Sequence, residues 1–171
     1  MPIGRRLPTC PTKTATIGTL MISAMSYTMH RVFCATPEDC EAERQAFHDA
    51  LGDFNEKAAM AHGILFVPVS IPLNMADKRL FQPAIDENIR SCRYYVEVIG
   101  GGEPAPQRNF EADRALAVAC AADPALPMCE VVSLAGYSNG CSNMDEYAAH
   151  WRGLLSRWLE SMMASSCGTP K

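Results

Sequence analysis

Residues 31–44 read Arg-Val-Phe-Cys-Ala-Thr-Pro-Glu-Asp-Cys-Glu-Ala-Glu-Arg, and this stretch decides the fold. A short apolar run, 32–35, stops at Thr36-Pro37, and an acidic helical pattern begins at once. Thr36 is expected to be the N-cap of this helix, and Pro37 suits its first position. The Asp39 side chain can accept a hydrogen bond from the backbone N–H of the cap residue. A strand that leads directly into a helix is the opening unit of an α/β domain, whose ligands bind where such strands end.

The rest of the chain repeats this alternation of strand and helix. Apolar runs rich in β-branched and aromatic residues predict strands at 32–35, 64–71, 94–99 and 129–135. Helical patterns predict helices at 37–61, 83–92, 110–122 and 145–165, separated by connections at 72–81, 100–108 and 136–143. Strict alternation predicts a flavodoxin-like three-layer α/β sandwich, with a parallel sheet of four or five strands in the order 2-1-3-4.

Individual residues refine this prediction. Pro68 removes one ladder donor, which favours an edge position for the second strand. Pro83 is expected in the first turn of its helix, and Asn109 is expected to cap the helix that begins at Phe110. The last helix carries a regular apolar stripe, which we interpret as core rather than as a groove for a partner. That stripe comprises Tyr147, Trp151, Leu154, Leu155, Trp158, Leu159 and Met162.

The length of 171 residues suits a single domain. We place this domain at residues 29–166, after a disordered leader at 1–28 and before a short tail at 167–171. Met21, Met25 and Met29 all lie close to the first strand, so each is an alternative start. Polar residues interrupt the apolar stretch 15–29 too often for a good signal peptide, although that alternative stays open.

Charge and cysteine content exclude several classes of protein. The leader holds three of the 15 basic residues and no acid, which leaves 12 basic against 19 acidic residues, or −7, in the rest of the chain. Such a body repels polyanions, so we expect no nucleic-acid partner. No apolar run reaches the length that spans a bilayer, so we expect no membrane partner. The eight cysteines form no Cys-x-x-Cys pair, which favours reduced thiols in a cytoplasmic protein without a bound metal or cofactor.

Glycine-containing motifs give weak signals. The first strand–helix turn lacks the glycines of a dinucleotide-binding fingerprint, and the chain has no P-loop motif. Gly100-Gly101-Gly102 follows the third strand and could be a hinge or a phosphate-binding turn. Residues 136–140 match Gly-x-Ser-x-Gly, but the only later histidine, His150, lies on the final helix, so we interpret this match as a turn.

Carboxylates form the strongest candidate site. Asp39 follows the first strand, whereas Glu111 and Asp113 open the helix after the third strand. In a sheet of order 2-1-3-4 these strands are neighbours at the switch point, so both groups are expected to face one crevice. Paired carboxylates across a crevice can stabilise an oxocarbenium-like transition state. Helix capping and compensation of the helix dipole are the alternative explanations.

The segments 31–52, 81–99 and 109–117 resemble bacterial TIR-like domains related to nucleoside 2-deoxyribosyltransferases. The motifs that carry this resemblance are Val-Phe-Cys-Ala-Thr-Pro-Glu-Asp, Ile-Asp-Glu-Asn-Ile and Asn-Phe-Glu-Ala-Asp. The resemblance implies that Glu111 would attack or stabilise an anomeric carbon, and that Asp39 and Glu87 would orient a ribose. The family's Gly-Thr/Ser before this glutamate is Asn109-Phe110 here, a departure that favours recognition without catalysis.

Two functional hypotheses follow. The first is a signalling or stress-response module that binds a nucleotide, a nucleoside, a protein partner or another copy of itself. The alternative is an N-glycosidic enzyme of the NAD hydrolase or deoxyribosyltransferase type with Glu111 as its catalytic residue. Both use the same predicted binding residues, which are Thr36, Asp39, Glu87, Gly100, Gly101, Asn109 and Asp113.

Overall fold

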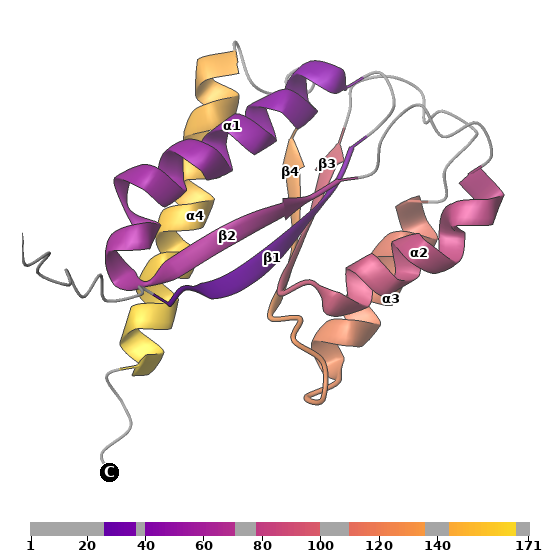
Figure 1. Ribbon diagram of the computed structural model, residues 1–171. Helices are drawn as coiled ribbons and strands as arrows, with labels where there is room; N and C mark the ends of the chain where they lie inside the picture. Colours follow the sequence, from indigo (N-terminus) through magenta and orange to yellow (C-terminus); the bar gives the residue numbers. More distant parts are fainter. Residues whose placement is uncertain (1–25, 37–39, 71–77, 100–109, 136–143, 167–171) are drawn as a thin grey trace, which may run out of the picture.

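The computed structural model describes residues 26–36, 40–70, 78–99, 110–135 and 144–166. Strands and helices alternate along these residues (Figure 1). The elements are β1 (Thr28–Ala35), α1 (Glu41–Lys57), β2 (Ile64–Val69), α2 (Lys78–Ser91), β3 (Tyr94–Ile99), α3 (Phe110–Ala122), β4 (Glu130–Ala135) and α4 (Met144–Ser166).

The four strands form one parallel sheet in the order β2-β1-β3-β4, which confirms the predicted flavodoxin-like α/β fold. Val32 in the middle of β1 pairs with Pro68 on one side and Tyr94 on the other. Tyr94 in turn pairs with Glu130 at the start of β4. The carboxyl ends of β1 and β3 therefore lie side by side, and the helices that follow them, α1 and α3, lie on opposite faces of the sheet (Figure 1).

Two apolar cores hold the three layers together. Helices α1 and α4 cover one face of the sheet, and α2 and α3 cover the other (Figure 1). Because successive strand residues point to opposite faces, β1 contributes Val32 and Cys34 to the first core and Phe33 and Ala35 to the second. The predicted stripe of α4 is buried along its whole length, which confirms that it is core.

The edge position predicted for the strand that contains Pro68 is confirmed, since β2 lies at one end of the sheet. Asn55 of α1 covers this strand, because its side chain accepts a hydrogen bond from Phe66 N (2.9 Å) and donates one to Phe66 O (2.8 Å). The proline and the asparagine together leave little of this edge available to another strand.

Two helix boundaries differ from the prediction. Helix α1 ends at Lys57 rather than continuing to residue 61, and a 3-10 helix (Ala59–His62) follows it. This tighter turn buries Ala59 completely and ends at Gly63, whose φ of 69° is open to glycine without strain. Helix α2 begins at Lys78, so Pro83 lies inside the helix and not in its first turn. Pro83 is exposed and removes a single helical hydrogen bond.

The predicted cap of α1 is also wrong. Cys40, not Thr36, occupies the N-cap position of α1, and no side-chain hydrogen bond caps this end. Cys40 is 3% exposed, and Cys34 is buried in the core. Thr36 is buried at the end of β1, where its hydroxyl oxygen accepts a hydrogen bond from Arg44.

Candidate anion site at the carboxyl edge of the sheet

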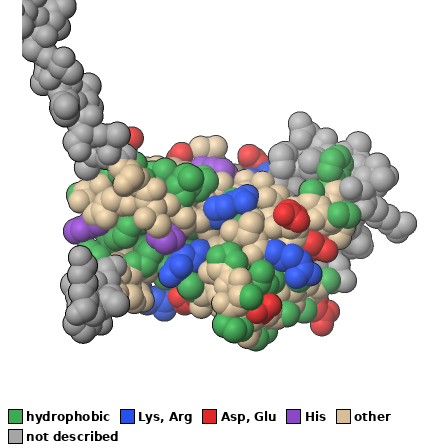
Figure 2. Space-filling view, turned by 60° about the horizontal axis from the view of Figure 1, so that its bottom comes forward, with side chains coloured by type: hydrophobic (Ala, Val, Ile, Leu, Met, Phe, Trp, Pro, Cys, Tyr) green, Lys and Arg blue, Asp and Glu red, His purple; other side chains and the backbone are tan. Residues whose placement is uncertain are grey.

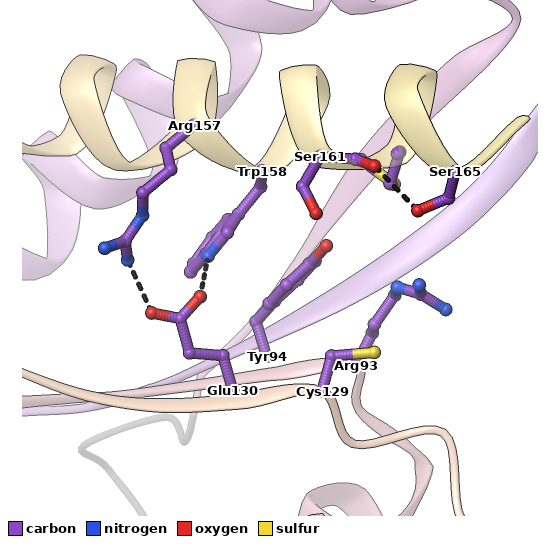
Figure 3. Close-up of a pocket in the computed structure, with 9 residues that line it drawn as sticks. Arg93, Tyr94, Cys129, Glu130, Arg157, Trp158, Ser161 and Ser165 are labelled. Atoms are coloured by element: carbon purple, nitrogen blue, oxygen red, sulfur yellow. Dashed lines mark hydrogen bonds and ion pairs between the residues drawn. The ribbon is translucent and has the colours of Figure 1, made fainter. Parts of the chain in front are cut away.

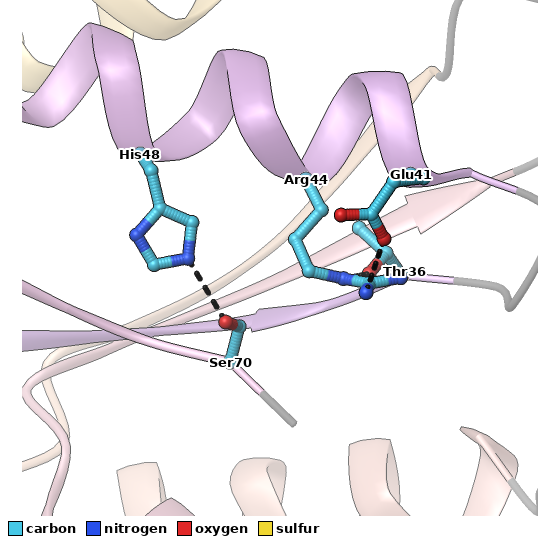
Figure 4. A network of polar contacts seen from close by, with 5 residues as sticks. All are labelled: Thr36, Glu41, Arg44, His48 and Ser70. Carbon is cyan, nitrogen blue, oxygen red and sulfur yellow. Dashed lines mark hydrogen bonds and ion pairs between the residues drawn. The ribbon is translucent and has the colours of Figure 1, made fainter. Parts of the chain in front are cut away.

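Arg44 dominates the polar contacts where β1 meets α1 (Figure 4). The first turn of α1 places its side chain beneath the helix and against the end of β1. Its Nε donates to Thr36 Oγ1 at 3.3 Å, and its Nη1 donates to the Glu41 carboxylate at 2.6 Å. The third nitrogen, Nη2, is buried and has no hydrogen-bond partner among the described residues. A buried guanidinium with an unused donor can bind an acceptor supplied by a ligand.

The two partners of Arg44 differ in exposure. The side chain of Arg44 is 9% exposed, whereas that of Glu41 is 66% exposed. Glu41 therefore contributes a carboxylate that is largely solvated, and the pair is only three residues apart on one helix. Its carboxylate occupies the place at which another anion would meet Nη1, so a ligand could replace it at small cost.

His48 and Ser70 extend this network along α1 toward β2 (Figure 4). His48 Nε2 lies 2.9 Å from Ser70 Oγ. Burial lowers the pKa of His48 below its usual 6.5, and the positive charge of Arg44 lowers it further. Asp49 and Glu41 act in the opposite direction, but the desolvation is the largest cause. The neutral imidazole is thus favoured next to Arg44, which keeps a second positive charge away from the guanidinium.

Next to Arg44, α1 also buries a carboxylate. Glu43 is 5% exposed, and its charge acts on the hydroxyl of Tyr147 at the start of α4. Burial raises the pKa of Tyr147 well above its usual range, and the charges of Cys34, Glu43 and Cys40 add to this effect. Arg44 pairs with Glu41 rather than with Glu43.

The two carboxylates predicted in the first turn of α3 lie in different environments. Glu111 is exposed, whereas Asp113 is 2% exposed and accepts a hydrogen bond from Gln82 of α2 at 3.1 Å. Arg114, one residue on, lies 3.6 Å from Glu97 of β3. The acidic first turn of α3 thus has an inward carboxylate held by a neighbouring helix and an outward carboxylate in solvent.

The predicted site residues are only partly brought together. Thr36 lies with Arg44 at the end of β1, and Asp113 lies at the start of α3. Glu87 is an exposed residue of α2 for which no contact with either group is found among the described residues. Asp39, Gly100, Gly101 and Asn109 lie outside the described residues.

Sequence reasoning missed Arg44, although a signal was present. Arg44 lies three residues before Phe47 and seven before Leu51, a spacing that places it on the buried face of α1. A charged residue on a buried helix face needs a partner or a ligand. The position of Arg44 in the apolar pattern therefore indicates a binding residue more clearly than its residue type does.

A second hollow lies at the opposite, amino edge of the sheet (Figure 3). It has a volume of about 300 Å³ and lies between α4 and the first residues of β3 and β4. Glu130 accepts hydrogen bonds there from Trp158 Nε1 (2.7 Å) and from Arg157 (2.5 Å). The Trp158 ring stacks on Tyr94 with a centroid distance of 3.9 Å. These groups bond mainly to one another, so the contacts that line the hollow hold α4 against the sheet.

The molecular surface at this amino edge carries basic and acidic side chains that are interspersed rather than segregated (Figure 2). Among the residues that the structure describes, no group of three or more His, Cys, Asp or Glu is placed to hold a metal ion. No helix in the described ranges is long and apolar enough to cross a membrane.

Comparison of the chain with protein-family models, curated proteins and solved structures finds no match.

Proposed function

We propose that this domain is a binding module that recognises a small anionic ligand of the nucleotide type at the carboxyl edge of its sheet, and that it acts in signalling without turning the ligand over. The observation that carries this proposal is the buried Arg44 guanidinium, whose Nη2 has no hydrogen-bond partner among the described residues. In open α/β sheets this edge is the usual place of ligand binding.

The arrangement favours a phosphate or carboxylate as the bound group. Arg44 offers planar, charged donors that match such anions in a bidentate manner. The N-terminus of α1 lies beside it, and the N-cap residue Cys40 makes no side-chain cap bond to the first-turn N–H groups. Helix N-termini favour negative charge, so both groups act on an anion in the same sense.

The acidic start of α3 supports a ligand that also carries hydroxyl groups. Glu111 is exposed there and could accept a hydrogen bond from a sugar hydroxyl, whereas Asp113 is buried and accepts from Gln82. A phosphate near Arg44 and a ribose near α3 together describe a nucleotide, in line with the TIR-like resemblance of the sequence. The distribution of charge also favours binding over catalysis, because Glu111 is exposed and no described residue orients it.

Isothermal titration calorimetry with adenosine monophosphate, adenosine and inorganic phosphate tests this proposal. We expect adenosine monophosphate to bind more tightly than adenosine. Arg44→Met should lose roughly 10- to 100-fold of the affinity for the monophosphate, the value of one charged hydrogen bond, and leave adenosine binding unchanged. Arg90→Met, at an exposed position of α2, is the matched control and should bind like the wild type.

Glu41→Gln gives a second and independent measurement. Because this change removes the carboxylate that competes for Arg44, it should raise the affinity for the monophosphate. Thermal unfolding of each variant establishes that it is folded. Equal binding of adenosine and its monophosphate, or unchanged monophosphate binding by a folded Arg44→Met variant, would refute the proposal.

An N-glycosidic enzyme is the second candidate, and the exposed carboxylate of Glu111 in the first turn of α3 favours it. The test is release of free base from NAD and from a panel of nucleosides, measured by chromatography. We expect wild type and Glu111→Gln to release the same small amount. Release that Glu111→Gln abolishes and the control Glu160→Gln retains would replace the binding module with the enzyme.

A further inference from the structure

Strand β4 has an open outer edge. It is the last strand of the sheet and pairs only with β3 among the described residues. Just before β4, Cys129 N donates to Arg93 O at 2.7 Å. Hydrogen-bonding direction alternates along a parallel ladder, so residues 131 and 133 also bond to β3, and Val132 and Leu134 direct their backbone groups outward.

Among the residues that the structure describes, this edge lacks the protection that the other edge has. In β2, Pro68 removes a donor and Asn55 covers the backbone of Phe66. The sequence of β4, Glu-Val-Val-Ser-Leu-Ala, contains neither proline nor lysine. Unprotected edges of this kind pair with further strands.

An apolar groove of about 490 Å³ lies beside the open edge, between β4 and α4. Val132 and Leu134 form its floor, and Ala149, Gly153 and Leu154 form its wall. Gly153 is exposed in the interior of a long helix, and a Cβ there would meet nothing within 4 Å. A glycine at such a position costs about 1 kcal/mol relative to alanine, and no contact within the described residues requires it. The small residues leave space for another helix to approach closely.

We propose that a second copy of this chain occupies this surface, with the two β4 strands antiparallel about a two-fold axis and the sheet continuous across both copies. A two-fold axis at Ser133 pairs Val132 of one copy with Leu134 of the other. The backbone N–H and C=O groups of both residues point outward, and their side chains point into the groove. A single register therefore pairs these backbone groups between the copies and brings the apolar side chains of the two groove floors together.

The charges on α4 select the same register independently. Arg157 lines the groove, and Glu146 lies eleven residues earlier, about three helical turns away and therefore on the same side of α4. An antiparallel contact that pairs each with the other's counterpart has its centre between residues 151 and 152. Glu130 lies level with Arg157 and Trp158, because it bonds to both. Ser133 lies about 10 Å from Glu130 along β4. Residue 151 lies about 10 Å from residues 157–158 along α4. The strand and the helix therefore place the axis at the same height.

Cysteine crosslinking tests this register. Ser133 faces its own counterpart across the axis as a non-hydrogen-bonded pair, at a Cα separation of about 4.5 Å, which a disulfide can bridge. In the matched control Val131→Cys, the two thiols would lie about 13 Å apart, too far for a bond. Under mild oxidation, Ser133→Cys should form a covalent dimer above the wild-type background, and Val131→Cys should not.

Light scattering after size-exclusion chromatography tests the interface without oxidation. The wild type should have twice the chain mass of 18.7 kDa. Gly153→Leu should be monomeric, because the new side chain fills the space at the helix contact. The monomer itself should gain stability, since leucine is the better helix former and a Cβ at this position meets nothing within 4 Å.

A charge reversal separates this surface from others. Glu146→Arg, which leaves the Arg157–Glu130 pair intact, should weaken the dimer by about tenfold or less, as expected for an exposed pair. A wild type that stays monomeric, a dimer unaffected by Gly153→Leu, or equal crosslinking of the two cysteine variants would overturn the proposal. None of these measurements depends on ligand binding at Arg44.

Discussion

At the scale of single residues, burial sets chemical behaviour more strongly than residue type. Arg44 and Arg90 are both arginines of helices, yet one is buried against Thr36 and the other is in solvent. The same contrast separates Asp113 from Glu111, which lie two residues apart on α3. A residue's position on a helix face therefore decides whether it can take part in binding.

The cysteines give a direct prediction at this scale. Burial raises the pKa of Cys92 to about 12, whereas Cys129 is exposed. Because the thiolate is the reactive form, iodoacetamide should modify Cys129 in the native protein and reach Cys92 only after unfolding. Mass spectrometry of native and denatured samples measures both rates. Comparable modification of the two thiols in the native state would contradict the prediction.

Some residues could be identified from the sequence and others could not. The apolar stripe of α4 and the edge role of Pro68 follow from periodicity and from a missing donor, both of which are local properties. The capping role of Thr36 was predicted from a local motif and is wrong, because the chain continues to Cys40 before α1 begins. Arg44 was missed because its binding capacity depends on which of its donors find partners after folding.

At the scale of elements, α1 is joined to β2 by polar contacts as well as by apolar packing. Asn55 forms two hydrogen bonds with the backbone of Phe66, a residue that is 1% exposed. The order of strands follows from the alternation of elements, but such contacts between a helix and a strand edge have no pattern in the sequence. The early start of α2 at Lys78 also escaped prediction, since Pro83 suggests a helix start at its own position.

Asn55→Ala should lower the free energy of unfolding by about 2 kcal/mol, because it leaves a buried backbone donor and acceptor without partners. Asn88→Ala is the matched control. Asn88 accepts from Arg31 at a partly buried position, so its loss should cost less. Urea denaturation followed by circular dichroism measures both variants. Equal losses would show that the backbone contacts of Asn55 contribute no more than an ordinary side-chain pair.

At the scale of the whole molecule, two half-buried histidines make folding sensitive to pH. Desolvation lowers the pKa of both His30 and His48 below 6.5, and the charges of Arg93 and Arg44 add to it. The unfolded chain therefore binds more protons than the folded domain once the pH falls below 6.5. Their contribution to stability is complete above that pH and is lost as the pH falls through the folded-state values.

We accordingly expect the free energy of unfolding to decrease between about pH 7 and pH 5, the range in which imidazole titrates. His48→Gln should reduce this slope, because glutamine can still reach Ser70 and does not titrate. Urea denaturation at a series of pH values measures the slope for both proteins. An identical slope in the variant would show that His48 does not contribute to it.

The unequal edges of the sheet also limit how far assembly can extend. A sheet with two open edges can add copies at both ends and grow into a filament. In the proposed dimer, the edges that the described strands leave are the two β2 strands, each covered by Asn55 and interrupted by Pro68. Growth therefore ends at two copies, and the asparagine that stabilises the fold also keeps the protein from polymerising.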